Sequence, residues 1–235
     1  MSTKQKYLIV TAGGSGTRMG ASVPKQFLML GGVPILQMTI SKFVNSIPEL
    51  KVITVLPEDY IGLWKEKCYE NNFIVPQILV SGGLTRFHSV ANALEKVPDG
   101  AIVAVHDGVR PFVSQSLLKR LFEEAETNPG VVPAVPCVDT LRPVRRSDNG
   151  KELIRLDDAP VDRSRVFAVQ TPQIFHSEIL KKSYGQAYDV SFTDDASVVE
   201  KAGFPVKYME GERLNIKITT PEDLSLAEMV HILYK

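Results

Sequence analysis

A glycine-rich loop followed by two cationic side chains is the part of this sequence whose residue types and spacing first suggest chemistry. The apolar run at residues 7–10 leads directly into TAGGSGTRMG. Glycines let a ligand approach the main chain, so the N–H groups of residues 13–17 are suited to binding phosphate oxygens. Arg18 and Lys25 would neutralise a triphosphate there, the arginine through directional hydrogen bonds and the lysine as a point charge. Alone, this loop is equally compatible with a structural turn beside two solvated cations.

Two common phosphate-binding loops do not fit these residues. A Walker A loop requires GxxxxGK[ST], and GGSGTRMG has no lysine followed by serine or threonine at that offset. In the dinucleotide fingerprint GxGxxG, Gly14 and Gly16 fit but Met19 occupies the third glycine position. No acidic residue stands near Thr39 or Ile40 to hold a ribose. The sequence therefore argues against a dinucleotide-dependent oxidoreductase.

A second glycine-rich segment, SGGLTRFHSV, follows the apolar run at residues 77–80. Gly82 and Gly83 expose main-chain groups, and with Ser89 they form an edge suited to reading a flat base through hydrogen bonds. The structural alternative is an ordinary strand-to-helix turn in which Ser89 is a buried helix residue.

Charged residues follow another apolar run in HDGVRPFV, which begins at His106. This motif places Asp107 and Arg110 at a predicted strand end, where a carboxylate is costly to hold without a cation, hydroxyl or metal partner. The alternative is an ion pair between these two residues that braces the loop. Lys217, in the late segment LNIKITTPEDL, is either an anion-binding residue or an exposed surface lysine.

The remaining nucleophiles and metal-binding residue types are scattered. The histidines have no spacing suited to zinc, and a structural or surface role is expected for His88, His106, His176 and His231. Cys68 and Cys137 form no CxxC pair and are expected to be buried or idle thiols. No Gx[ST]xG elbow is present, so we expect chemistry without a covalent enzyme intermediate and no metal site built from side chains.

Apolar, β-prone runs alternate along the chain with amphipathic helical patterns. Strands are predicted for YLIV, KVITVL, QILV, AIVAVHD and GVVPAVP, which begin at residues 7, 51, 77, 101 and 130. Helices are predicted from Pro34, from the capping residue Ser114, and from Glu222 after Thr220 and Pro221. This alternation predicts an α/β fold with a Rossmann-like, mainly parallel twisted sheet and helices on both faces. In such sheets ligands bind beyond the carboxyl ends of the strands, where the glycine loop and HDGVRP stand.

Residues 138–168 interrupt this alternation. A turn signal at 147–150 is flanked by short β-prone, highly charged arms. We expect a β-hairpin arm that projects from a single domain spanning residues 1–235. Its length favours packing on another subunit over solvent exposure.

Overall charge is balanced, with 27 basic and 27 acidic residues, which argues against a nucleic-acid-binding protein. The first 48 residues nevertheless contain five cations and no acidic residue, so the glycine loop is expected to lie in positive potential. No apolar stretch is long enough to span a bilayer and no signal peptide is evident, so a cytoplasmic protein without a membrane partner is expected.

Seven segments, in order and spacing, resemble the 2-C-methyl-D-erythritol 4-phosphate cytidylyltransferases of the non-mevalonate isoprenoid pathway. They are TAGGSGTRMGASVPKQFLMLGGVPIL, SGGLTRFHSV, VHDGVRPFV, VDT, VDRSRVFAVQTPQIF, FTDDASVVE and NIKITTPEDL, within residues 7–226. The resemblance implies a nucleotidyltransferase fold whose β-arm, residues 138–168, exchanges between the protomers of a homodimer. It also implies that CTP and methylerythritol 4-phosphate give 4-diphosphocytidyl-2-C-methyl-D-erythritol and pyrophosphate, with Mg²⁺ accompanying the triphosphate.

The resemblance also implies roles for individual residues. Arg18 and Lys25 match transition-state stabilisers, and Arg163 and Lys217 match residues that fix the incoming phosphate. The nucleotide contacts that it implies are Ala12, Gly13, Gly14, Gly16, Gly83 and Ser89. The further contacts that it implies to the phosphate and polyol of the second substrate are Asp107, Arg110, Thr140, Thr171 and Thr193. Thr140 and Arg163 stand on the arm, so they are expected to reach across the dimer.

Two residues depart from the family pattern. Gly13 stands where members often have a second alanine, which should loosen the loop but keep its N–H groups. Leu84 stands where some members have an acidic residue, so it lacks the hydrogen bond that a carboxylate would offer the nucleotide.

The mechanism that this suggests needs no general base. A phosphate monoester is largely dianionic near neutral pH, so its oxygen can attack the α-phosphorus of CTP directly. The expected task of the protein is to hold two anions in line, with Arg163 and Lys217 on the incoming phosphate. Arg18, Lys25 and Mg²⁺ are expected to stabilise charge on the α-phosphate and the leaving pyrophosphate.

Three other activities remain open from sequence. A ribitol-5-phosphate cytidylyltransferase would share the glycine loop, HDxVRPF and QTPQ, although PVDRSRVF and FTDDAS, which hold Arg163 and Thr193, resemble the methylerythritol enzyme more closely. A catalytically silent nucleotide-binding module has no need for two anion sites. A sugar-1-phosphate nucleotidyltransferase is expected to carry further metal-binding acids and a longer chain.

Overall fold

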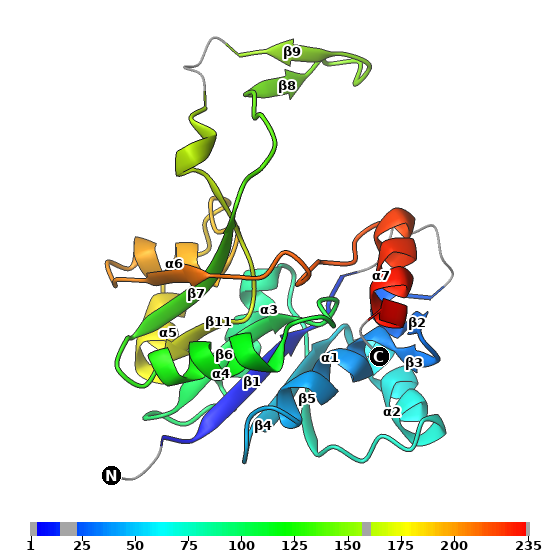
Figure 1. Ribbon diagram of the computed structural model, residues 1–235. Helices are drawn as coiled ribbons and strands as arrows, with labels where there is room; N and C mark the ends of the chain where they lie inside the picture. The colour runs from blue at the N-terminus through cyan, green and yellow to red at the C-terminus, as the bar shows by residue number, and fades with distance from the viewer. Residues whose placement is uncertain (1–3, 15–22, 157–160, 234–235) are drawn as a thin grey trace.

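The computed structural model describes residues 4–14, 23–156 and 161–233 of the chain (Figure 1). Within these ranges an eight-stranded sheet forms the centre of the molecule. Its strands are β1 (Lys6–Thr11), β4 (Lys51–Leu56), β5 (Gln77–Ser81), β6 (Ile102–Asp107), β7 (Gly130–Pro136), β10 (Phe167–Val169), β11 (Gln173–His176) and β12 (Lys207–Glu210). Two short ladders lie outside it: β2 (Met29–Leu30) with β3 (Val33–Pro34), and β8 (Val144–Arg146) with β9 (Leu153–Arg155).

The central strand of the parallel part of the sheet is β1. It pairs with β4 on one side and with β6 on the other, and β5 continues the parallel sheet beyond β4. The mainly parallel sheet predicted from sequence is therefore confirmed, and the predicted runs correspond to β1, β4, β5, β6 and β7. Sequence patterns did not indicate β11, which lies antiparallel between β6 and β7. Beyond it, β12 pairs with β7 in parallel and β10 pairs with β7 antiparallel.

Helices of the described residues cover both faces of this sheet, except for α7, which packs on the β2–β3 ladder. They are α1 (Ile35–Val44), α2 (Ile61–Glu70), α3 (Arg86–Leu94), α4 (Gln115–Glu124), α5 (Ser177–Tyr184), α6 (Asp195–Lys201) and α7 (Pro221–Leu233). The helices predicted from Pro34, Ser114 and Glu222 are α1, α4 and α7. Ser114 caps α4 as expected, because its side chain accepts a hydrogen bond from the Leu117 N–H over 3.0 Å.

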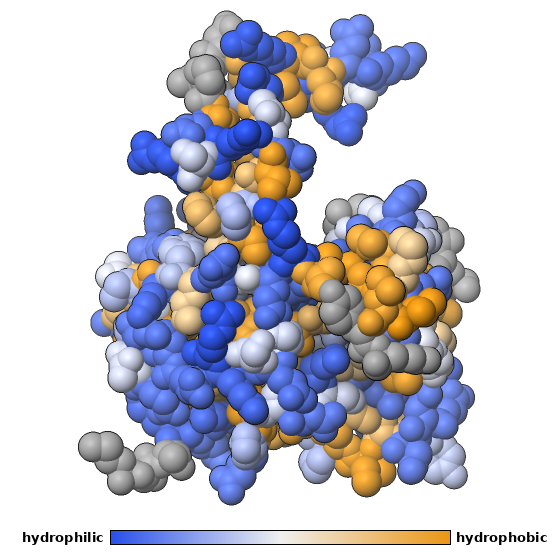
Figure 2. All heavy atoms as spheres, in the orientation of Figure 1, coloured by the Kyte–Doolittle hydropathy of each residue, from blue (hydrophilic) through white to orange (hydrophobic). Residues whose placement is uncertain are grey.

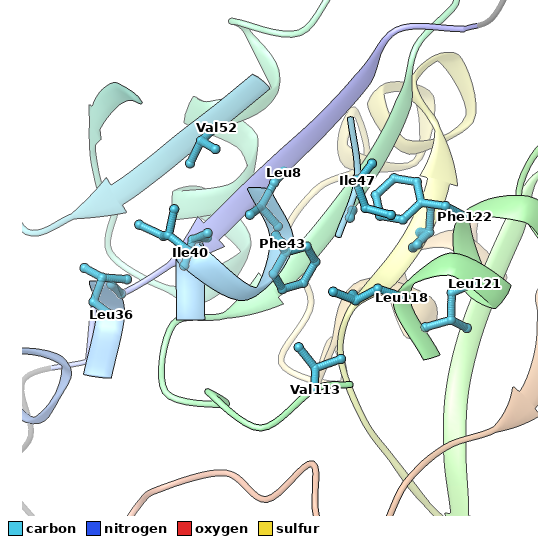
Figure 3. Packing of buried hydrophobic residues seen from close by; sticks show 14 of the residues in the cluster. Leu8, Leu36, Ile40, Phe43, Ile47, Val52, Val113, Leu118, Leu121 and Phe122 are labelled. Atoms are coloured by element: carbon cyan, nitrogen blue, oxygen red, sulfur yellow. The ribbon is translucent and has the colours of Figure 1, made fainter. Parts of the chain in front are cut away.

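Two apolar clusters hold the helices to the sheet. On one face, Ile40 and Phe43 of α1 and Leu118 and Phe122 of α4 pack with Leu8 of β1, and all five side chains are buried (Figure 3). On the other face, α3, α5 and α6 cover a second cluster of buried residues. Each such side chain stabilises the fold by roughly 1.5–3 kcal/mol when fully buried. Burial on both faces explains why the central strands are nearly continuous apolar runs.

The predicted hairpin arm projects away from the body of the molecule (Figure 1). Val144 of β8 pairs with Arg155 of β9, and the turn between these strands closes with a hydrogen bond from the Gly150 N–H to the Ser147 carbonyl. Gly150 has a φ of 70°, a conformation that glycine adopts without steric cost. The arm exposes apolar side chains as well as charges (Figure 2), with Leu153 66% exposed.

The C-terminal helix α7 docks on the β2–β3 ladder through a small third cluster. Leu30 and Ile35 pack there with Ala227 of α7. The imidazole of His231 lies directly over Gly31, in the space that a Cβ atom on Gly31 would occupy. Among the described residues, no helix combines the length and apolar character that a bilayer crossing requires.

Gly31→Ala is expected to destabilise the protein more than Gly32→Ala. Both glycines have positive φ, 58° and 84°, so each alanine costs about 1–2 kcal/mol of backbone strain. Only the Cβ at residue 31 also overlaps the His231 ring, because nothing lies within 4 Å of a Cβ at residue 32. In a His231→Ala background the two costs should become similar. Urea unfolding of the six proteins, which are the two backgrounds and the two glycine variants of each, tests this, and equal costs in the parent background would contradict it.

Candidate active site

The carboxyl ends of β1, β4, β5 and β6 meet at one edge of the sheet. Thr11 at the end of β1 is paired with Asp107 at the end of β6, and the Gly108 N–H donates to the Thr11 carbonyl over 3.0 Å. Directly after β5, the Gly82 N–H donates to the Leu56 carbonyl at the end of β4 over 2.8 Å. The loops that follow β1, β5 and β6 therefore lie next to one another, as the topology requires.

A cavity of about 310 Å³ opens between these loops. Of the residues predicted from sequence, those that line it are Ala12, Gly13, Gly14, Lys25, Gly83, Ser89, Asp107 and Lys217. The structure thus brings together the glycine loop, the second glycine-rich segment, the β6 strand end and the late lysine. Thr11, Gln26, Leu84, Thr85, Arg86 and Val109 complete the lining.

The first glycine loop keeps its main chain open to the cavity. Gln26 is buried and donates its Nε2–H to the Ala12 carbonyl over 2.7 Å, and this hydrogen bond holds the start of the loop in place. Gly13 and Gly14 are exposed, and a Cβ on Gly14 would lie 3.8 Å from Cε of Lys25, so the lysine side chain passes beside the loop. Gly16 and Arg18, which complete the predicted triphosphate site, lie outside the described residues.

The second glycine-rich segment forms a compact turn into α3. The Gly83 N–H donates to the hydroxyl of Ser89 over 3.0 Å, and a Cβ on Gly83 would collide with His88. Glycine at this position is therefore required by packing as well as by access to the cavity. Leu84 is 96% exposed at the cavity rim. An apolar side chain therefore stands where some members of the family that the sequence resembles have a carboxylate.

Three cations surround the buried carboxylate of Asp107. Lys217 Nζ lies 3.0 Å from its Oδ2, Arg110 Nε lies 3.2 Å from the same oxygen, and Arg86 Nε lies 3.8 Å from Oδ1. Burial alone would raise the pKa of Asp107, but the charges of Arg86, Lys217 and Arg110 outweigh burial and hold the pKa well below its ordinary value. Asp107 is consequently a fixed anion that gathers cations at the cavity.

Arg86 is the member of this site that sequence reasoning missed. Its two terminal nitrogens donate to the two carboxylate oxygens of Asp195, over 2.9 Å and 2.6 Å. Burial alone would lower the pKa of Arg86, but Asp195 and Asp107 outweigh burial and raise it. Arg86 and Asp195 stand in the motifs SGGLTRFHSV and FTDDASVVE. The signal that could have identified Arg86 is that a carboxylate at a strand end needs cations nearby.

A chain of hydrogen bonds behind Asp107 holds Arg110 and Thr171. The Asp107 N–H donates to Oγ1 of Thr171, which lies 2.9 Å from Nδ1 of His106, and Nε2 of His106 lies 3.1 Å from the Arg110 carbonyl. Arg110 also donates to the carbonyl of Asn215, two residues before Lys217. Arg110 and Thr171 therefore lie next to the cavity residues but behind its lining, and Arg110 supports the segment that carries Lys217.

Three predicted site residues lie elsewhere in the chain's fold. Thr140 and Arg163 stand on the arm and Thr193 on the loop before α6; all three are exposed and none lines the cavity. Arg163 begins a short 3-10 turn, Arg163–Arg165, and donates to the Val138 carbonyl over 3.3 Å.

Metal binding has little support from side chains in the described part of the chain. No group of three or more histidine, cysteine, aspartate or glutamate residues there could hold an ion. The carboxylate that lines the cavity, Asp107, already has both oxygens directed at cations.

A mostly parallel α/β sheet with a cationic, glycine-lined cavity at its strand ends is the arrangement expected of a nucleotidyltransferase. The family model of 2-C-methyl-D-erythritol 4-phosphate cytidylyltransferase matches residues 7–232. Accordingly, the chain belongs to this family.

Named relatives support the same assignment. The chain is 47% identical over 222 residues to a 2-C-methyl-D-erythritol 4-phosphate cytidylyltransferase of Bacteroides thetaiotaomicron, covering 94% of this chain and 97% of the relative. It is 45% identical to the enzyme of the same name from Porphyromonas gingivalis, covering 97% and 98%.

Solved structures show the same fold. The 4-diphosphocytidyl-2C-methyl-D-erythritol synthase of Anaerococcus prevotii superposes with a TM-score of 0.77 at 28% identity, covering 97% of this chain and 99% of that one. The cytidylyltransferase of Thermus thermophilus gives 0.71 at 32%, covering 97% and 98%. The resemblance stated from sequence and the nucleotidyltransferase fold are confirmed, and the methylerythritol phosphate enzyme is favoured over the ribitol phosphate enzyme and the silent module.

His106 is expected to make the stability of the protein depend on pH. Burial lowers the pKa of His106 from 6.5 to about 4, so folded His106 is neutral while unfolded His106 takes up a proton. Its stabilising contribution is complete above about pH 6.5 and is lost as the pH falls toward 4, by on the order of 3 kcal/mol.

Urea unfolding of the parent protein and of His106→Gln, measured between pH 7 and pH 4.5, tests this contribution. The variant should be less stable at pH 7, because the histidine hydrogen bonds are disturbed, and should lose less stability on acidification. Parallel pH profiles would show that His106 does not titrate in this way.

Proposed function

We propose that this protein joins CTP and 2-C-methyl-D-erythritol 4-phosphate to give 4-diphosphocytidyl-2-C-methyl-D-erythritol and pyrophosphate, by direct in-line attack. The observation that carries the proposal is a single cavity with cations on two sides. Lys25 lies beside the open main chain of Gly13 and Gly14, and Lys217 lies next to Asp107. One side suits the triphosphate and the other suits a second phosphate.

The reaction forms one P–O bond and breaks another. An oxygen of the dianionic phosphate monoester attacks the α-phosphorus of CTP, and the bond from that phosphorus to the β-phosphate bridging oxygen breaks as pyrophosphate leaves. No proton needs to be removed from the nucleophile. Asp107 is not a proton acceptor in this scheme, because its surrounding cations keep its pKa well below the ordinary value.

Each side of the cavity has its own cations in this mechanism. Arg18 and Lys25 act on the α-phosphate and the leaving pyrophosphate, which enter as Mg²⁺-bound CTP, and Mg²⁺ neutralises part of the phosphate charge. Lys217, which is 41% exposed at its Asp107 ion pair, binds the incoming phosphate together with Arg163. The nucleotide lies against Ala12, Gly13, Gly14, Gly16, Gly83 and Ser89. Asp107, Arg110, Thr140, Thr171 and Thr193 hold or support the substrate phosphate and polyol.

We propose a homodimer in which the arm, residues 138–168, completes the cavity of the partner subunit. The arm projects away from its own body (Figure 1). Neither Thr140 nor Arg163 lines the cavity of its own chain. Exposed apolar side chains of the arm, such as Leu153 and Phe167, favour burial against protein. We place the enzyme in the cytoplasm, where CTP is available.

Pyrophosphate release should be fast with Mg²⁺, CTP and methylerythritol 4-phosphate and slow with ribitol 5-phosphate in its place. Parallel assays with the two polyol phosphates measure this directly. Release with ribitol 5-phosphate alone would reassign the substrate, and release with neither would favour a nucleotide-binding module.

Lys25→Ala should reduce turnover by roughly 100-fold while weakening CTP binding much less, because the charge on the α-phosphate grows in the transition state. Steady-state kinetics and CTP titration calorimetry separate the two effects. Lys42→Ala removes an exposed lysine of α1 and serves as the control. Weaker CTP binding with unchanged turnover would assign Lys25 to ground-state binding alone.

A further inference from the structure

The paired charges of Arg86 and Asp195 are not used by the mechanism above, although Arg86 lines the cavity. Asp195 is fully buried, whereas the Arg86 side chain is 30% exposed. Tyr184 of α5 donates its hydroxyl hydrogen to Oδ1 of Asp195 over 2.6 Å. Burying an ion pair is a weak source of stability, so its presence at the cavity wall requires another explanation.

This ion pair connects the two loops that carry the predicted substrate contacts. Arg86 is the first residue of α3, directly after the Gly83 turn of the nucleotide side. Asp195 is the first residue of α6, two residues after Thr193 on the polyol side. The start of α6 is fixed further by Gln173, which donates to Asp194 and accepts from the Ala196 N–H. The ion pair between Arg86 and Asp195 therefore connects the turn at Gly83, called here the nucleotide turn, to the loop that contains Thr193, called here the substrate loop.

The same geometry sets how close Arg86 comes to Asp107. Its Nε stays 3.8 Å from Oδ1 of Asp107, which exceeds hydrogen-bond length, because both terminal nitrogens are engaged by Asp195. Lys217 is then the closest cation to Asp107, at 3.0 Å. Without the Asp195 charge, the guanidinium would be drawn onto Asp107 and would compete with Lys217 for it.

We propose that Asp195, itself oriented by the Tyr184 hydroxyl, is a positioning residue that holds Arg86 off Asp107. It thereby keeps both the nucleotide turn and Lys217 in their working positions. The role assigned to Lys217 rests on the proposed function. Because one ion pair serves both loops, CTP affinity and use of the polyol phosphate change together when it is lost.

Asp195→Asn tests this role while preserving the shape of the side chain. We expect the Kd for CTP to rise and kcat/KM for methylerythritol 4-phosphate to fall, each by on the order of tenfold, as misplacement of binding groups produces. Tyr184→Phe should change both quantities in the same direction by a smaller factor. If Asp195→Asn does not fold, Tyr184→Phe carries the test alone.

Tyr208→Phe is the matched control, because Tyr208 also donates its hydroxyl hydrogen to a carboxylate of α6, that of Glu200, over 3.0 Å. It should leave CTP affinity and kcat/KM unchanged. An Arg86→Gln background supplies the second test: there Asp195→Asn should change CTP affinity little further, because its effect passes through Arg86. Loss of stability in Asp195→Asn and Tyr184→Phe with unchanged CTP affinity and kcat/KM would overturn the proposal.

The two readouts keep the inference separate from the proposed function. If the parent protein binds CTP but does not turn over methylerythritol 4-phosphate, the proposed function fails. Titration calorimetry of the variants with CTP then still decides the role of Asp195. An unchanged Kd in Asp195→Asn would refute the role. A tenfold rise in Kd that disappears when the same substitution is made in the Arg86→Gln background would support it.

Discussion

The buried carboxylate of Asp107 is the constraint on which the site depends. A buried anion is stable only when cations approach it closely, and this chain supplies them from three separate segments. Arg86 comes from the start of α3, directly after the turn that follows β5, Arg110 from the loop after β6, and Lys217 from the segment before α7. The requirements of one side chain therefore fix the relative positions of three loops, and the cavity lies between them.

The sheet makes this convergence possible. Parallel pairing of β1 with both β4 and β6 places several strand ends at one edge, and the helices bury both faces without covering that edge. Loops at such an edge need not carry core side chains, so glycines and charged residues replace apolar ones there. Positive charge then accumulates next to open main-chain groups, which is the combination that binding two phosphorylated substrates requires.

Much of this arrangement could be predicted from sequence because it depends on local patterns. The position of Asp107 followed from a continuous apolar run, and that of Gly13 from a glycine cluster at a strand end. The pairing of Arg86 with Asp195 could not be predicted in that way, since 109 positions separate them in the chain. They become neighbours because α3 packs against α5 and α5 packs against α6. Helices α5 and α6 have eight and seven residues, too few for a clear helical period. The role proposed for Arg163 rests on a partner subunit, and the fold of one chain does not bring this residue to the cavity.

The antiparallel strand β11 has a consequence for how this protein is made. In the finished sheet β11 separates β7 from β6, although β7 precedes β11 in the chain. A ribosome releases residues 130–136 well before residues 173–176, with the whole arm between them. During synthesis, β7 is therefore an apolar strand that lacks its neighbour β11 until residues 173–176 have been translated. The half of the molecule that carries β1, β4, β5 and β6 has all its strands by residue 107, so the sheet is completed from its N-terminal half outward.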